Sequence, residues 1–157
     1  TVLGDTLYYL EGRWSVPEIY LLSINVLELK AMNMGLFTFY RLALDLEHVV
    51  TEICEFTDNT AAQHSAHNGT GHTERMVYLV AERYDMLVHA DAATAVVRIA
   101  SVDNDLADGL SRGGVYLADA LRLAAASGLK IRRVVVPPDV RCTDALRRMI
   151  QIAPNVD

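Results

Sequence analysis

Three carboxylates stand where acidic side chains are costly unless they do chemistry. Glu28 interrupts the apolar segment INVLELKAM in the opening turns of a predicted helix, where an unpaired charge destabilises the fold. Asp58 follows an apolar predicted strand, at the carboxyl end where α/β sheets bind ligands. Asp108 lies in the first turns of a short predicted helix that follows another strand. Carboxylates that converge from such places are ligands of Mg²⁺, so these three residues are candidate metal ligands and catalytic residues.

Two of the three also have an ordinary structural interpretation. Asp58 precedes Asn-Thr, as a turn or helix-cap residue often does. Asp108 would stabilise a helix N-terminus whatever the function of the protein. Spacing alone therefore leaves both interpretations open.

The elements that would position these carboxylates alternate between strand and helix. We expect strands at 1–10, 49–57, 93–102 and 130–136. We expect helices from a cap at Ser23 or Asn25 to about Leu44, and then at 61–67, 73–88, 105–111, 115–126 and 143–150. This order predicts an α/β fold with a mixed central sheet and helices on its faces. A single domain would span 1–157, with a core over about 1–113 and a helix–strand–helix extension over 114–157.

Composition agrees with one globular domain. The chain has 157 residues, of which 52% are hydrophobic and 22% charged, and this excludes a disordered or low-complexity protein. Charges interrupt every long apolar stretch, so we expect no membrane span and no membrane partner. Two cysteines provide no disulfide framework, which favours an intracellular location. The chain opens in mid-pattern, as a piece of a longer polypeptide would.

Charge is unevenly distributed along the chain. Residues 1–127 hold 8 Lys/Arg and 17 Asp/Glu, a net of −9, whereas residues 128–157 hold 6 and 3, a net of +3. A uniformly basic nucleic-acid binder is therefore not expected. An acidic protein can still act on nucleic acid where carboxylates hold a divalent metal, because the metal reverses the local field.

Three histidines, His64, His67 and His72, flank the Asn-Gly-Thr-Gly segment. No Cys or acidic residue completes a ligand set beside them, so ordinary loop histidines are favoured over a transition-metal site.

The segments around the three carboxylates resemble a known family. INVLELKA (24–31), FTDNTAA (56–62) and IASVDNDLADGLSRG (99–113) occur in the order of the ribonuclease H domain of retroelement reverse transcriptases. GRWS (12–15) and VVVPPDVR (134–141) extend the similarity over roughly residues 1–150. The chain is most similar to the tyrosine-recombinase (DIRS-like) retrotransposon type, and more distantly to hepadnaviral polymerases.

This resemblance implies a ribonuclease H-like fold and hydrolysis of the RNA strand of RNA–DNA hybrids by two metal ions, Mg²⁺ or Mn²⁺. Glu28, Asp58 and Asp108 would be the metal-binding catalytic carboxylates. Asn59 would contact a substrate 2′-hydroxyl, and Arg112 is a further substrate-binding candidate. The domain would act beside an upstream reverse transcriptase domain of the same polyprotein.

The chain departs from the family at its start. The family carries its first catalytic aspartate on a first strand, whereas residues 1–10 contain only Asp5, in a Gly-Asp-Thr context typical of a turn. Either that strand precedes residue 1 or the site has lost a ligand. A missing first strand would leave a sheet edge uncovered, where another chain or domain could pair. The alternative function is a catalytically incomplete or domesticated domain that serves as a scaffold or interaction module.

Overall fold

The computed structural model describes residues 1–141, which form two compact units. The first unit comprises Thr1–Arg13 and Ile99–Val135, and the second comprises Trp14–Arg98 and residues 136–141. Both contain helices and strands, so the predicted α/β class is confirmed. The helix predicted at 143–150 lies outside the described residues.

The first unit is built on a three-stranded mixed sheet. Its elements are β1 (Val2–Leu3), β2 (Thr6–Tyr9), η1 (Ser101–Asp103), α5 (Asp105–Arg112), α6 (Gly114–Ala126) and β5 (Lys130–Arg133). β2 lies in the middle, antiparallel to β1 and parallel to β5. β5, the strand predicted within the 114–157 extension, thus pairs with the N-terminal residues.

One predicted strand of this unit is wrong. Residues 1–10 form a hairpin instead of a continuous strand, because Gly4 adopts a φ of +59° and reverses the chain before Asp5. Glycine takes this left-handed conformation without a steric penalty. The turn context of Asp5 is therefore confirmed.

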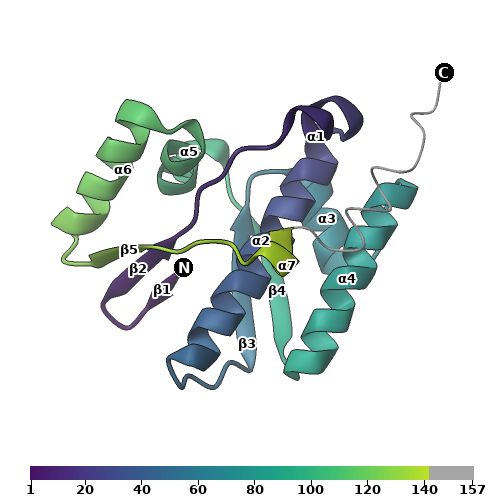
Figure 1. The fold of residues 1–157 in the computed structure, drawn as a ribbon, viewed down its shortest axis with the longest axis horizontal. Coiled ribbons are helices and arrows are strands. Elements are labelled where there is room, and N and C mark those ends of the chain that lie inside the picture. Colours follow the sequence, from purple (N-terminus) through teal and green to yellow (C-terminus); the bar gives the residue numbers. More distant parts are fainter. Residues whose placement is uncertain (142–157) are drawn as a thin grey trace. The chain divides into compact units, whose positions relative to one another are not determined.

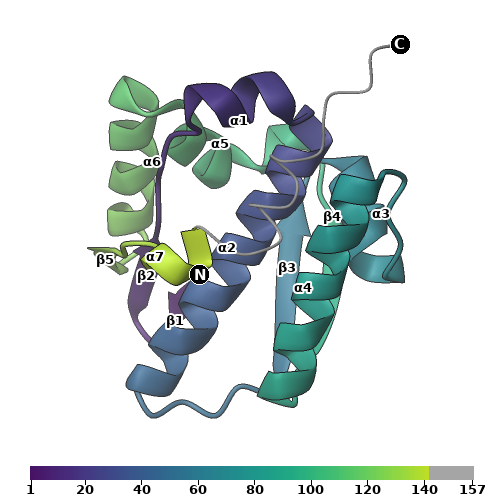
Figure 2. The ribbon, with the colours of Figure 1, turned by 45° about the vertical axis from the view of Figure 1, so that its right-hand side comes forward.

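The second unit holds most of the helices. Its elements are α1 (Val16–Leu21), α2 (Ile24–Asp45), β3 (Glu52–Thr57), α3 (Thr60–Asn68), α4 (Glu74–Ala90), β4 (Ala93–Arg98) and α7 (Pro138–Arg141). β3 and β4 are parallel, in register from Glu52 opposite Ala93 to Thr57 opposite Arg98. In Figures 1 and 2, α2 and α4 lie side by side along this two-stranded sheet.

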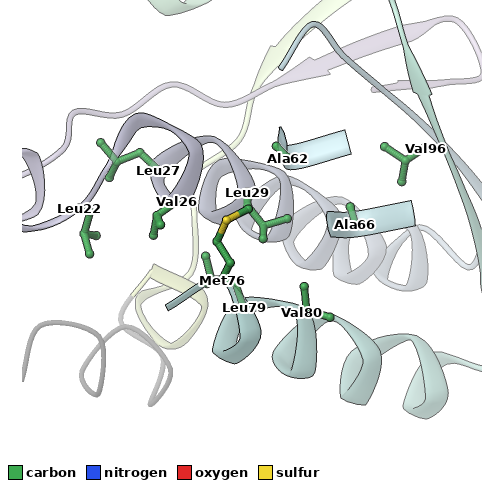
Figure 3. Close-up of a cluster of buried hydrophobic side chains, with 10 residues drawn as sticks. All are labelled: Leu22, Val26, Leu27, Leu29, Ala62, Ala66, Met76, Leu79, Val80 and Val96. Carbon is green, nitrogen blue, oxygen red and sulfur yellow. The ribbon is translucent and has the colours of Figure 1, made fainter. Parts of the chain in front are cut away.

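The core of the second unit lies between its helices and one face of β3 and β4. Figure 3 shows Val96 of β4 facing a group of apolar side chains from α2, α3 and α4. The buried members of this core are Leu22, Val26, Leu27, Leu29, Ala62, Ala66, Met76, Leu79, Val80 and Val96. On the other face of the sheet Phe56 and Val97 are exposed. This alternation follows from the two-residue period of a strand.

Two further expectations need correction. The single mixed central sheet is, within residues 1–141, a three-stranded and a two-stranded sheet. No helix was expected before the cap at Ser23 or Asn25, yet α1 precedes it. Its signal is the spacing Ser15-Val-Pro-Glu18: the Ser15 hydroxyl accepts from the Glu18 amide, and the Glu18 carboxylate accepts from the Ser15 amide. This capping box is readable from the sequence.

Candidate metal-binding and catalytic site

Glu28 lies one turn into α2, between buried neighbours. Leu27 and Leu29 pack into the core, while Glu28 is half-buried. Ser23 occupies the N-cap, so of the two caps considered Ser23 is correct and Asn25 falls inside the first turn. The helix thereby carries a carboxylate close to its N-terminal end.

Asp58 stands directly after β3, where the chain leaves the sheet to enter α3. The next residue, Asn59, caps α3, since its Oδ1 accepts a hydrogen bond of 2.9 Å from the Ala62 amide. The Asn59 amide in turn donates to Thr57 Oγ1 at 3.2 Å. Asp58 is thus held between a buried strand end and a capped helix start. Its placement at the carboxyl end of a strand is confirmed.

The fold brings Glu28 and Asp58 close enough to influence each other. Partial burial of the Glu28 carboxyl raises its pKa above the ordinary value, and the negative charge of Asp58 raises it further. No hydrogen bond or cation among the described residues offsets these two causes. Two acidic groups that repel each other at a half-buried position are a recognised mark of a functional site.

A second contact joins the same two segments. Asn59 Nδ2 donates to Asn25 Oδ1 at 3.2 Å, and Asn25 precedes Glu28 by three residues on α2. Residues three apart on a helix share a face. The site therefore consists of two carboxylates and, beside them, two hydrogen-bonded amides.

This arrangement fits a hydrated divalent cation. Mg²⁺ commonly binds through one or two carboxylates and keeps several waters. A cation between Glu28 and Asp58 would remove the cause of their repulsion. Among residues 1–141, no group of three or more His, Cys, Asp and Glu side chains has the geometry of a metal site. At this site a cation would therefore have two carboxylate ligands, Glu28 and Asp58.

Asp108 lies in the first unit, on α5. It forms an ion pair with Arg112, whose Nε lies 2.9 Å from Asp108 Oδ1 and 2.8 Å from Oδ2. The guanidinium of Arg112 also lies 5.4 Å from the centre of the Tyr116 ring. A pair four residues apart on a helix is an ordinary stabilising contact. Asp108, a candidate metal ligand, and Arg112, a candidate substrate contact, thus bind each other.

The neighbourhood of Asp108 depends on a close helix contact. A Cβ on Gly109 would lie 2.8 Å from the Ala120 Cβ and 2.9 Å from the Tyr116 carbonyl oxygen. α5 and α6 can therefore pack at this distance only because residue 109 is glycine.

Two of the three histidines, His64 and His72, contact each other. His64 and His72 stack with ring centres 5.5 Å apart, and Asn68 Nδ2 lies 3.0 Å from His64 Nδ1. Stacked rings direct their nitrogens sideways instead of toward a shared ion.

Asn25 is the site residue that the sequence analysis missed in this role. It was considered there only as a helix cap. The signal that could have identified it is the spacing Asn-x-x-Glu, which places an amide on the helix face of the candidate carboxylate.

Comparisons of the chain with protein-family models, with curated proteins and with solved structures give no match. Within residues 1–141, no helix combines the length and the apolar character that crossing a lipid bilayer requires.

Proposed function

We propose that this chain is a metal-dependent nuclease domain that cleaves the RNA strand of RNA–DNA hybrids, within a larger reverse transcriptase polyprotein. The observation that carries the proposal is the placement of half-buried Glu28 near the start of α2 and of Asp58 at the end of β3, two segments joined by the hydrogen bond between Asn25 and Asn59. Burial, and then the charge of Asp58, raises the pKa of Glu28. The substrate class comes from the resemblance of the segments that hold the carboxylates to ribonuclease H domains.

The chain's own residues would do the following. Glu28 and Asp58, both ionised, would hold Mg²⁺ or Mn²⁺ through carboxylate oxygens, with the remaining positions left to water and substrate. Such an ion supplies a polarised water and stabilises charge on the phosphodiester oxygens. By the resemblance Asp108 is a third catalytic carboxylate, and within its own unit it is ion-paired with Arg112.

Asn59 retains capacity for a substrate contact. Its Oδ1 caps α3 and one Nδ2–H faces Asn25. An amide has a second N–H, which can donate to a 2′-hydroxyl. Arg112 is exposed and holds Asp108 through Nε, so its guanidinium would approach a phosphate from the edge that does not face Asp108.

The test is cleavage of a hybrid whose RNA strand carries a label. We expect cleavage in Mg²⁺ or Mn²⁺ and none in a chelator. Asp58→Asn and Glu28→Gln should abolish it, because each removes one carboxylate while preserving side-chain size. Asp85→Asn is the matched control, since Asp85 is an exposed acid on α4. Cleavage by Asp58→Asn at the wild-type rate would contradict the proposal.

A second candidate is a scaffold domain without catalysis. Two observations favour it: no group of three metal-ligating side chains occurs in residues 1–141, and Asp108 is ion-paired to Arg112. A scaffold would show no cleavage and no thermal stabilisation by millimolar Mn²⁺. A nuclease would be stabilised, because an ion that binds only the folded state raises the melting temperature.

A further inference from the structure

The amide pair Asn25 and Asn59 lies in the same two segments as the candidate carboxylates. Asn25 precedes Glu28 by one helical turn, and Asn59 follows Asp58 directly. The hydrogen bond of 3.2 Å between their side chains thus joins α2 to the junction of β3 and α3. It connects positions 34 residues apart in the chain.

Other hydrogen bonds join this junction to β4 and not to α2. Gln63 Nε2 donates to the Val96 carbonyl at 3.3 Å, and Arg98 Nε donates to Thr60 Oγ1 at 3.0 Å. Both contacts tie α3 to β4. α2 and α3 also share the apolar core, to which Leu29, Ala62 and Ala66 belong. Apolar packing is not directional, whereas a hydrogen bond fixes both distance and orientation.

Directional support matters here because two carboxylates can share one ion only at a fixed separation. Glu28 lies near the end of its helix, where the backbone lacks a side-chain cap. The hydrogen bond between Asn25 and Asn59 fixes the position of this helix end relative to the segment that carries Asp58.

We propose that Asn25 is a positioning residue that, through Asn59, holds Glu28 and Asp58 at the separation at which they bind one divalent cation together. This inference rests on the proposed function, of which it specifies the cation site. Asn25 acts through Asn59 and touches neither the cation nor the substrate.

The test is a double-mutant cycle on Mn²⁺ affinity, measured on the full chain without substrate by electron paramagnetic resonance. Asn25→Leu removes the acceptor. Asn59→Ser retains a hydroxyl that can cap α3 but cannot reach Asn25. We expect each variant to bind Mn²⁺ roughly 10-fold more weakly, as loss of an outer contact of a metal site does. The double variant should be no weaker than either single variant, because both remove the same bond.

Asn68→Leu is the matched control, as Asn68 is exposed on the last turn of α3 and contacts His64. It should bind Mn²⁺ as the wild type does. Circular dichroism at the titration temperature shows which variants are folded; should Asn25→Leu not fold, Asn59→Ser alone must still show the 10-fold loss.

The outcomes separate the inference from the proposed function. Tight binding by the wild type with unchanged affinity in both single variants overturns the positioning role and leaves the cation site intact. A loss in Asn25→Leu alone, with Asn59→Ser unchanged, also overturns it, because Asn25 would then act directly. Absence of Mn²⁺ binding by the wild type overturns the cation site itself and the inference with it.

Discussion

Two acidic side chains three residues apart on the same segment have opposite environments. Glu55, within β3, accepts hydrogen bonds from the buried guanidinium of Arg83 and from Thr94 Oγ1, the latter at 2.7 Å. Asp58, just beyond the end of β3, lies close enough to Glu28 for its charge to raise the pKa of that carboxyl, which burial also raises. The charge of Glu55 is thus balanced by Arg83, whereas the charge of Asp58 adds to the negative charge of Glu28.

The difference separates a structural acid from a candidate functional one. Glu55 links three elements, since Arg83 lies on α4 and Thr94 on β4. Its charge is needed to keep Arg83, with 1% of its side chain exposed, inside the unit. Glu28 and Asp58 stabilise nothing comparable. Natural proteins accept such local destabilisation at sites where the groups bind or react.

The largest effect should come from the structural acid. Glu55→Ala leaves a buried guanidinium without its anionic partner, so the free energy of unfolding should fall by about 3–5 kcal/mol. Urea denaturation followed by circular dichroism measures it. The paired variant Glu55→Leu with Arg83→Leu should recover much of the loss, because no unpaired charge stays buried. A small loss in Glu55→Ala would show that Arg83 finds other partners, and the contrast with Asp58 would disappear.

The next effect concerns the candidate functional pair. Mn²⁺ at 100 times its dissociation constant should stabilise the wild type by about 2.7 kcal/mol, since only the folded state assembles both carboxylates. Glu28→Gln and Asp58→Asn should each lose this stabilisation, whereas Asp85→Asn should retain it. Thermal unfolding with and without the ion measures the difference. Equal stabilisation of all four proteins would place the bound ion elsewhere.

Without metal, a smaller effect is expected from Glu28→Gln. It should raise the free energy of unfolding, whereas Glu55→Ala lowers it. The raised pKa of Glu28 means that the folded state holds this proton more tightly than the unfolded state. Stability is therefore lost as pH rises from the ordinary value of 4.5 through the raised pKa. Glu28→Gln cannot ionise, so above this range it should be more stable than the wild type. Because solvent screens charges that are partly exposed, the gain should lie in the range of such interactions, about 0.2–1 kcal/mol.

Measurements at low pH are the control for the gain in stability of Glu28→Gln. Below the ordinary pKa of Glu28 both proteins carry an uncharged side chain at position 28, and their free energies of unfolding should converge. A gain that persists unchanged at low pH would arise from packing of the glutamine and not from charge.

Sequence reasoning located the carboxylates better than it located their surroundings. Helix and strand positions follow from local periodicity, and α4 begins at the predicted cap Thr73. Apolar spacing within 73–88 predicts one buried face made of Met76, Val77, Val80, Tyr84 and Leu87. Of these residues, Met76, Val80 and Leu87 are buried. Val77 and Tyr84, predicted on the same face, are 49% and 50% exposed.

The physical reason is Arg83. Apolar periodicity assigns a charged residue to the solvent side, yet Arg83 takes a core position because Glu55 and Thr94 accept hydrogen bonds from its two terminal nitrogens. Those partners come from strands distant in sequence, so no local pattern reveals them. The same limit applies to the link between Asn25 and Asn59 and to the influence of Asp58 on Glu28. Residue type and spacing predict which acids to examine, and tertiary contacts decide which are neutralised.

The smallest effect should come from an exposed acid, Asp139. Its contribution to stability should depend on pH in the opposite sense to that of Glu28. Asp139 on α7 is held by both terminal nitrogens of Arg41 on α2, at 3.1 and 2.7 Å. The hydrogen bond from Arg41 lowers the pKa of Asp139 below its ordinary value of 3.8. Its contribution to stability is therefore present above that value and is lost as pH falls through the lowered pKa.

Asp139→Asn should consequently be less stable than the wild type at neutral pH and equal to it in strong acid, whereas Glu28→Gln should be more stable at neutral pH. Because Arg41 and Asp139 are exposed, added salt should reduce the difference in stability between Asp139→Asn and the wild type. Unfolding free energies from pH 2 to 7 at two salt concentrations measure both variants together. Differences of the same sign would mean that Glu28, like Asp139, has a cationic partner, and the candidate site would lose its distinguishing feature.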